Sequence, residues 1–137
     1  MSEHESGKPS LYDRLGGEPG LRAYVDRFYE IMQSDPEAQA IWALHRRGLD
    51  ELKDRLVLFL SSFVGGPVVY PQKYGAPMMR ARHLPFPIGV EERDAWLRCA
   101  YQALAATFDD RPAALQFAQG LTRFADHMRN RDEVTRP

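Results

Sequence analysis

The residue with the clearest capacity for chemistry is His83, one of four histidines in a chain of 137 residues. Two methionines precede it at a short distance, and Leu84-Pro85-Phe86-Pro87 follows directly, so apolar side chains flank one imidazole. A neutral imidazole held among apolar neighbours at the end of a short helix is what a haem iron requires on its proximal side. The alternative is a structural histidine, because neutral imidazole tolerates partial burial.

Three further residues carry polar groups on or beside helices that the sequence predicts: Tyr29, His45 and Trp96. A buried tyrosine or tryptophan needs a partner for its OH or NH group. The alternative for Tyr29 and Trp96 is an ordinary aromatic core, and for His45 a helix end or the surface. Cys99 is the only cysteine, so it cannot form an intrachain disulfide or attach a haem covalently through a CxxCH motif.

Composition narrows the remaining function classes. The 18 Lys and Arg residues nearly balance the 19 Asp and Glu residues, which removes the electrostatic attraction expected of a nucleic-acid or anionic-membrane binder. The longest charge-free run, 56–72, is interrupted by Gly65-Gly66-Pro67, whereas a membrane-spanning helix needs about 20 apolar residues. With a polar start and one cysteine, we expect a cytoplasmic protein with no membrane span and no nucleic-acid partner.

The candidate residues must be positioned mainly by helices, because apolar residues recur at helical spacing along most of the chain. No strand pattern of comparable quality occurs, so the expected fold class is all-α. Helices are predicted from the Gly16-Gly17 turn through Met32, from Asp35 to about Leu44, from Leu49 to Phe63, from Val90 to Phe108, and from Pro112 to Asn130.

Between Gly66 and Gly89 the pattern changes, because five prolines leave room for only one short helical piece, around 78–83. This segment is rich in aromatic residues and methionine, which argues against disorder and for packing against a partner. The expected organisation is an N-terminal tail at 1–10, one domain at 11–130 and a C-terminal tail at 131–137.

The order of these residues resembles that of the group II truncated haemoglobins. The resemblance runs from about Leu11 to Asn130 and rests on these segments: Phe28-Tyr29, Phe59-Leu60 before Gly65-Gly66-Pro67, Tyr74-Gly75-x-Pro77-x-x-Arg80-x-Arg82-His83-x-Pro85-Phe86-x-Ile88, and Glu92-Arg93-Asp94-Ala95-Trp96-Leu97. It implies a two-over-two helical sandwich around a non-covalent haem b.

In that family likeness His83 is the proximal iron ligand, while Tyr29, His45 and Trp96 line the distal side. Counting back from Phe59 favours His45 over Trp42 as the distal aromatic contact. The helix that faces the ligand carries Leu52 and Leu56, which offer no polar contact. The implied cofactor contacts are Phe28, Leu52, Leu56, Phe59, Leu60, Tyr70, Lys73, Met79, Arg82, Phe86 and Ile88, with Lys73, Arg80, Arg82 and Tyr70 as candidates for the haem propionates.

The resemblance predicts binding of oxygen, nitric oxide or carbon monoxide, with an external reductase and a homodimer as candidate partners. Three donors at about 0.5–1.5 kcal/mol each would stabilise oxygen by about 1.5–4.5 kcal/mol. That corresponds to roughly 10- to 1000-fold slower escape, which suits oxygen retention and redox or nitrosative-stress chemistry rather than delivery. One alternative is a peroxidase-like enzyme that uses His45 as acid and base. Another is a helical interaction module without a cofactor.

Overall fold

The structure is a computed structural model that describes residues 9–45, 48–76, 78 and 88–128. Across these residues it contains helices and no strand, which confirms the all-α prediction. The elements in chain order are α2 (Leu11–Arg14), α3 (Gly17–Ser34), η1 (Pro36–Ala38), α4 (Gln39–His45), α5 (Leu49–Phe63), α6 (Tyr70–Tyr74), α8 (Val90–Thr107) and α9 (Arg111–Met128).

The long helices follow their apolar stripes closely. Helix α3 begins after Gly16, whose φ of 92° is a left-handed conformation that glycine adopts without a Cβ penalty. After α3, the Asp35 carboxylate accepts a hydrogen bond from the Glu37 backbone N–H at 2.8 Å, and Pro36 occupies the first turn of η1. Helix α5 ends at Phe63, ahead of Gly65 with its φ of 87°. The predicted starts and stops are therefore correct to within a few residues.

Helix α6 corrects the expectation that 78–83 is the only helical piece between Gly66 and Gly89. It spans Tyr70–Tyr74 and carries Pro71 in its first turn, where the missing N–H leaves no intrahelical bond unmade. Gly75 ends it with a φ of 82°. The expected helical piece lies almost wholly outside the described residues.

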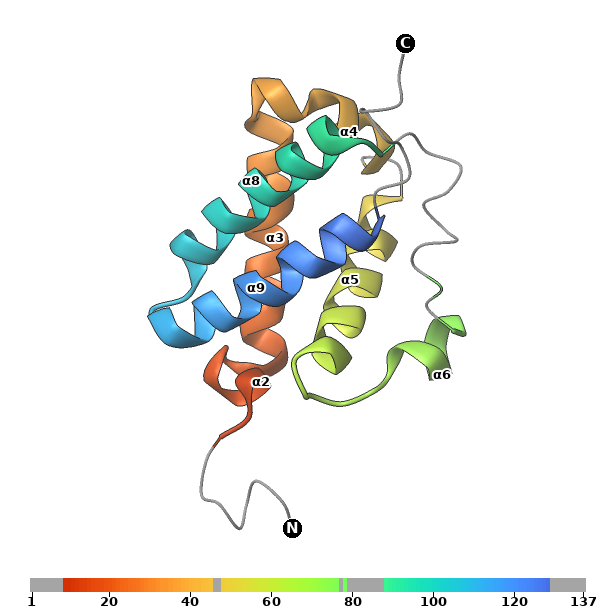
Figure 1. Cartoon of the computed structure of the whole chain (residues 1–137). Coiled ribbons are helices and arrows are strands. Elements are labelled where there is room, and N and C mark those ends of the chain that lie inside the picture. The colour runs from red at the N-terminus through yellow and green to blue at the C-terminus, as the bar shows by residue number, and fades with distance from the viewer. Residues whose placement is uncertain (1–8, 46–47, 77, 79–87, 129–137) are drawn as a thin grey trace.

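The four long helices form two packed pairs, α3 with α5 and α8 with α9, and α3 also packs against α8 (Figure 1). This is the two-over-two arrangement that the family resemblance implies. The core between the pairs is aromatic: the Tyr24 ring lies 5.6 Å from that of Phe108 and 5.3 Å from that of Phe117. At Gly120 a Cβ would lie only 2.8 Å from the Phe63 ring, so glycine allows α9 to approach α5.

Within the described part of the chain, no helix is both long enough and apolar enough to cross a membrane.

Candidate functional site

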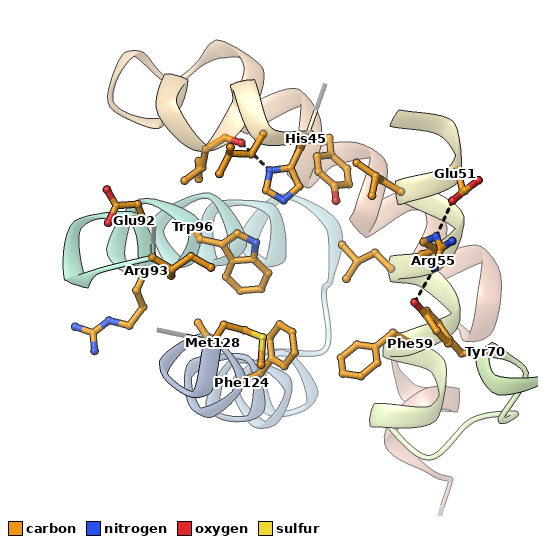
Figure 2. A pocket seen from close by; sticks show the side chains of 17 residues that line it. His45, Glu51, Arg55, Phe59, Tyr70, Glu92, Arg93, Trp96, Phe124 and Met128 are labelled. Carbon is orange, nitrogen blue, oxygen red and sulfur yellow. Dashed lines mark hydrogen bonds and ion pairs between the residues drawn. The ribbon is translucent and has the colours of Figure 1, made fainter. Parts of the chain in front are cut away.

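A cavity of about 430 Å³ lies between α5 on one side and α8 and α9 on the other, with α3 and α4 closing its end (Figure 2). Its volume falls within the roughly 300–1,000 Å³ range of small-molecule and cofactor sites. The predicted site residues that line it are Tyr29, His45, Leu52, Leu56, Phe59, Tyr70, Ile88 and Trp96.

Tyr29 presents a buried polar atom to this cavity. Its side chain is only 5% exposed, and its ring packs edge-on against Phe28 at 5.0 Å. Within the described residues no hydrogen bond is made by its hydroxyl group, although buried hydroxyl groups normally have a partner. Burial raises the pKa of Tyr29 above its usual value, so the phenol stays protonated and remains a donor. The residue is therefore suited to donate to a ligand in the cavity.

His45 enters the cavity from the last turn of α4, and Figure 2 shows its ring pointing into the pocket. Its Nδ1 lies 2.7 Å from the Ile41 carbonyl oxygen. A carbonyl oxygen only accepts, so the proton of the neutral ring is on Nδ1 and Nε2 is an acceptor. The expectation that His45 supplies a third donor therefore requires the imidazolium form.

Trp96 comes from the opposite side, on α8. Its ring stands edge-on to Phe28 at 5.1 Å and lies 6.0 Å from the ring of Phe124 on α9. Among the residues that the structure describes, none accepts a hydrogen bond from the indole N–H. The contacts with Phe28 and Phe124 thus fix the ring, while the indole N–H remains available as a donor. Trp42, the alternative to His45, packs against the core and does not line the cavity.

Helix α5 supplies an apolar wall. Leu52, Leu56 and Phe59 line the cavity at helical spacing, and Phe59 packs against the rings of Phe124 at 5.2 Å and Tyr70 at 6.5 Å. The sequence-based expectation that this helix offers a ligand no polar contact at Leu52 and Leu56 agrees with this arrangement.

Arg55 is a pocket residue that the sequence analysis missed. Its Nε donates to Glu51 at 2.8 Å, its Nη1 donates to the Tyr70 hydroxyl oxygen at 3.2 Å, and its guanidinium lies 4.1 Å from the centre of the Tyr74 ring. Only the helical position one turn from Glu51 and Phe59 could have suggested this placement. A cation on the rim of an apolar pocket is suited to hold the carboxylate of a bound group.

Asp54, beside Arg55 on α5, connects three helices. Its Oδ1 accepts from Arg22 of α3 at 3.1 Å, and its Oδ2 accepts from Lys73 at 2.7 Å and Tyr74 at 2.6 Å, both of α6. These hydrogen bonds, with that from Lys73 the largest cause, hold the pKa of Asp54 far below its usual range. Lys73, a candidate for the propionates, is therefore engaged on the surface and does not line the cavity.

The remaining predicted site residues fall into two groups. Phe28 and Leu60 are each 1% exposed and belong to the core behind the cavity wall. His83, Met79, Arg80, Arg82 and Phe86 lie outside the described residues. The cavity also includes side chains not singled out from the sequence as site residues: Ile41, Leu44, Glu51, Glu92, Arg93, Phe124, Ala125 and Met128. Three of these, Phe124, Ala125 and Met128, lie on the face of α9 that turns toward the cavity.

The lining fits a flat, largely apolar prosthetic group with carboxylates at its edge. The walls are leucine and isoleucine side chains and aromatic rings, and charged groups stand at the rim. The buried Tyr29 hydroxyl has no hydrogen-bond partner among the described residues. In the described ranges no cluster of three or more His, Cys, Asp or Glu residues could hold a bare metal ion.

A helical two-over-two sandwich enclosing such a pocket defines a globin. The chain belongs to the bacterial-like globin family, whose model matches residues 10–130, and within it to the group II truncated haemoglobins. The family implies a haem and small diatomic ligands such as oxygen.

A group 2 truncated haemoglobin of Bacillus subtilis (strain 168), YjbI, is 43% identical over 88 residues, which are 64% of this chain and 64% of that protein. That match therefore spans less than two thirds of the curated relative. Two solved structures extend further. The group II 2-on-2 haemoglobin of Agrobacterium tumefaciens has a TM-score of 0.86 at 37% identity, covering 97% of this chain and 100% of its own. A truncated oxygen-avid haemoglobin of Bacillus subtilis has a TM-score of 0.78 at 36% identity, covering 89% and 100%.

Proposed function

We propose that this globin binds oxygen reversibly at a non-covalently held haem b, retains it through hydrogen bonds from Tyr29 and Trp96, and serves redox or nitrosative-stress chemistry. The observation that carries the proposal is the Tyr29 hydroxyl, which is buried at the cavity without a hydrogen-bond partner among the described residues. An unpaired buried hydroxyl is costly to the fold, which supports a role in holding a ligand.

The cofactor would be held by His83 as proximal ligand and by the apolar walls, with Arg55 and Arg82 as candidates for its carboxylates. When bound, the haem supplies the iron at which diatomic ligands bind and at which oxygen gains partial negative charge. A non-covalent haem b is favoured because the chain has one cysteine and no CxxCH motif. In His83→Gly we expect the proximal-histidine absorption spectrum to be lost and restored by added imidazole. An unchanged spectrum in this variant would assign the proximal role elsewhere.

Retention follows from the donors that this chain aims at the ligand. Tyr29 and Trp96 are neutral donors, and at about 0.5–1.5 kcal/mol each they would contribute about 1–3 kcal/mol if additive. That free energy corresponds to roughly 5- to 150-fold slower oxygen release. The donors discriminate for oxygen over carbon monoxide, because the latter develops less negative charge. The oxygen-avid relative from Bacillus subtilis is consistent with such retention.

The test is the rate of oxygen dissociation from haem-loaded Tyr29→Phe and Trp96→Phe. We expect each single substitution to accelerate release by roughly 2- to 12-fold, which is one hydrogen bond of about 0.5–1.5 kcal/mol. Carbon monoxide dissociation serves as the internal control and should change less. Unchanged oxygen release in both variants would rule out distal retention. Nitric oxide consumption by the oxygenated protein, supported by an external reductase, then tests the proposed chemistry.

A peroxidase-like enzyme is the second candidate, and one observation favours it. The bond from His45 Nδ1–H to the Ile41 carbonyl makes Nε2 the basic nitrogen of the neutral ring. A base of this kind can take a proton from peroxide and return it to the leaving oxygen. His45→Ala should then slow the reaction with peroxide while leaving carbon monoxide binding in place. If peroxide reactivity is untouched, the peroxidase role of His45 is wrong.

A further inference from the structure

Two tyrosines of α6 form a short path from the cavity to the surface. Tyr70 lines the cavity and is 1% exposed, whereas Tyr74, one turn later, does not line it and is partly exposed. Their ring centres are 5.4 Å apart. Two phenol rings in such proximity can exchange an electron. An electron vacancy, that is, the one-electron oxidised state of a tyrosine, can therefore pass from one ring to the other.

The hydrogen bonding of the Tyr70 hydroxyl does not favour the oxidised state of this tyrosine. Its hydroxyl oxygen accepts from the Arg55 guanidinium at 3.2 Å. In the part of the chain that the structure describes, no acceptor lies within bonding distance of the Tyr70 proton. Removing an electron from a phenol makes it a strong acid, so an oxidised tyrosine is stabilised when its proton has an acceptor and destabilised by a nearby cation. Tyr70 lacks such an acceptor.

Tyr74 has the opposite arrangement at its hydroxyl group. It donates to the Asp54 carboxylate at 2.6 Å. Both tyrosines have a cation beside them, since the Arg55 guanidinium also lies 4.1 Å from the centre of the Tyr74 ring and Lys73 Nζ lies 5.4 Å from it. The proton acceptor is therefore what distinguishes the two tyrosines. The cations paired with Asp54 weaken this carboxylate as a base, but an oxidised phenol is acidic enough to give it a proton. A vacancy is therefore better accommodated at Tyr74 than at Tyr70.

We propose that Tyr70 and Tyr74 form an electron relay through which reducing equivalents enter the haem pocket, with Tyr74 as the surface site of one-electron oxidation and Asp54 as its proton acceptor. The relay would make the protein able to oxidise small phenolic or enediol reductants at α6. This inference rests on the proposed haem binding, and it does not depend on whether Tyr29 and Trp96 retain oxygen.

The electron balance is closed by hydrogen peroxide as oxidant. Peroxide takes two electrons at the pocket and two protons from solvent, and it leaves as two molecules of water. Each electron comes from Tyr70 and is replaced by one from Tyr74, whose O–H bond breaks as the proton passes to the Asp54 carboxylate. An external reductant such as ascorbate then gives Tyr74 a hydrogen atom, and Asp54 releases its proton to solvent. Two such turns consume one peroxide.

The experiment identifies the tyrosine that is left oxidised after treatment with peroxide. Haem-loaded protein is treated with hydrogen peroxide and a nitroso spin trap, then digested, and the adducts are located by peptide mass spectrometry. We expect the adduct on Tyr74 in the wild type, its loss in Tyr74→Phe, and a reduced yield at Tyr74 in both Asp54→Asn and Tyr70→Phe. Ascorbate added before the trap should suppress the adduct.

Matched controls separate the relay from other causes. Tyr101→Phe removes a tyrosine that is 40% exposed on α8, so it should leave the Tyr74 adduct unchanged. The haem-free protein should give no Tyr74 adduct. An adduct at Tyr74 in the haem-free protein, or an undiminished adduct in Tyr70→Phe, means direct oxidation from solvent and overturns the relay. A haem spectrum with no adduct at Tyr74 also overturns it, whereas absence of haem binding would instead refute the proposed function.

Discussion

The polar groups on the two sides of the pocket differ in their hydrogen bonding. On the side built by α3 and α8, the Tyr29 hydroxyl and the Trp96 indole N–H face the cavity without a partner among the described residues. On the side built by α5 and α6, Arg55 and Asp54 are joined to their neighbours by hydrogen bonds of 2.6–3.2 Å.

This difference separates the donors that are available to a small ligand in the cavity from the groups whose hydrogen bonds hold α5 and α6 together. A partnered side chain is fixed in place, and the hydrogen bonds that it makes stabilise the fold. An unpartnered donor costs free energy in the folded protein and is available for a ligand. Substitutions on the first side should therefore change ligand kinetics, and those on the second should change stability.

The largest expected effect is on oxygen release in the double variant Tyr29→Phe/Trp96→Phe. Loss of both donors should accelerate release by roughly 5- to 150-fold, from about 1–3 kcal/mol of hydrogen bonding. The unfolding free energy of the haem-free protein should hardly fall, because neither polar group has a hydrogen-bond partner to lose among the described residues. Stopped-flow oxygen release and urea unfolding measure the two quantities. A fall in stability with unchanged release would reverse the assignment of the two sides.

The sequence predicts the first side better than the second, for a physical reason. Tyr29 and Trp96 lie on long apolar stripes, whose helical period fixes which face turns inward. The partners of Asp54 come from α3 and α6, so only the folded chain brings Arg22, Lys73 and Tyr74 together. The sequence does not predict helix α6 either, because proline usually interrupts a helix. Pro71 is tolerated here because it stands in the first turn.

The next effect is on stability, in Asp54→Asn. The carboxylate is 20% exposed and accepts three hydrogen bonds, so its loss should lower the unfolding free energy by about 1–2 kcal/mol, allowing for screening at the surface. Oxygen release should remain within about 2-fold of wild type, since no donor to the ligand changes. The matched control is Asp26→Asn, which changes an α3 carboxylate that is 61% exposed and pairs with Lys53 of α5. We expect it to cost less than about 0.5 kcal/mol. Equal losses in both variants would refute the special position of Asp54.

A smaller effect is the pH dependence of that difference. The pKa of Asp54 is lowered in the folded protein, chiefly by the hydrogen bond from Lys73. Its stabilisation is therefore complete above the unfolded value of about 3.9 and is lost as the pH falls through the lower folded value. Urea unfolding should show a constant difference in unfolding free energy between wild type and Asp54→Asn from pH 7 down to about pH 4. Between pH 4 and pH 3 the difference should become smaller. A gap that grows in acid would have the wrong sign.

The smallest effect should be found at Cys99, a polar group of α8 one turn beyond Trp96 that does not serve the pocket. Its side chain is 0% exposed, and burial raises the pKa of the thiol to about 11. Relative to the reference of 9.0, that lowers the thiolate fraction at pH 8 by roughly 100-fold, because each unit is tenfold. An alkylating reagent should therefore leave the native protein unlabelled and react promptly in urea, and Cys99→Ala should keep the wild-type oxygen release. Rapid labelling of the native protein would mean that this part of α8 opens readily, and the fixed position assigned to Trp96 would then be untenable. The Cys99 thiol donates to the Asp35 carboxylate at 4.0 Å and does not line the cavity, whereas Tyr29 and Trp96 present to the cavity donors that have no partner among the described residues.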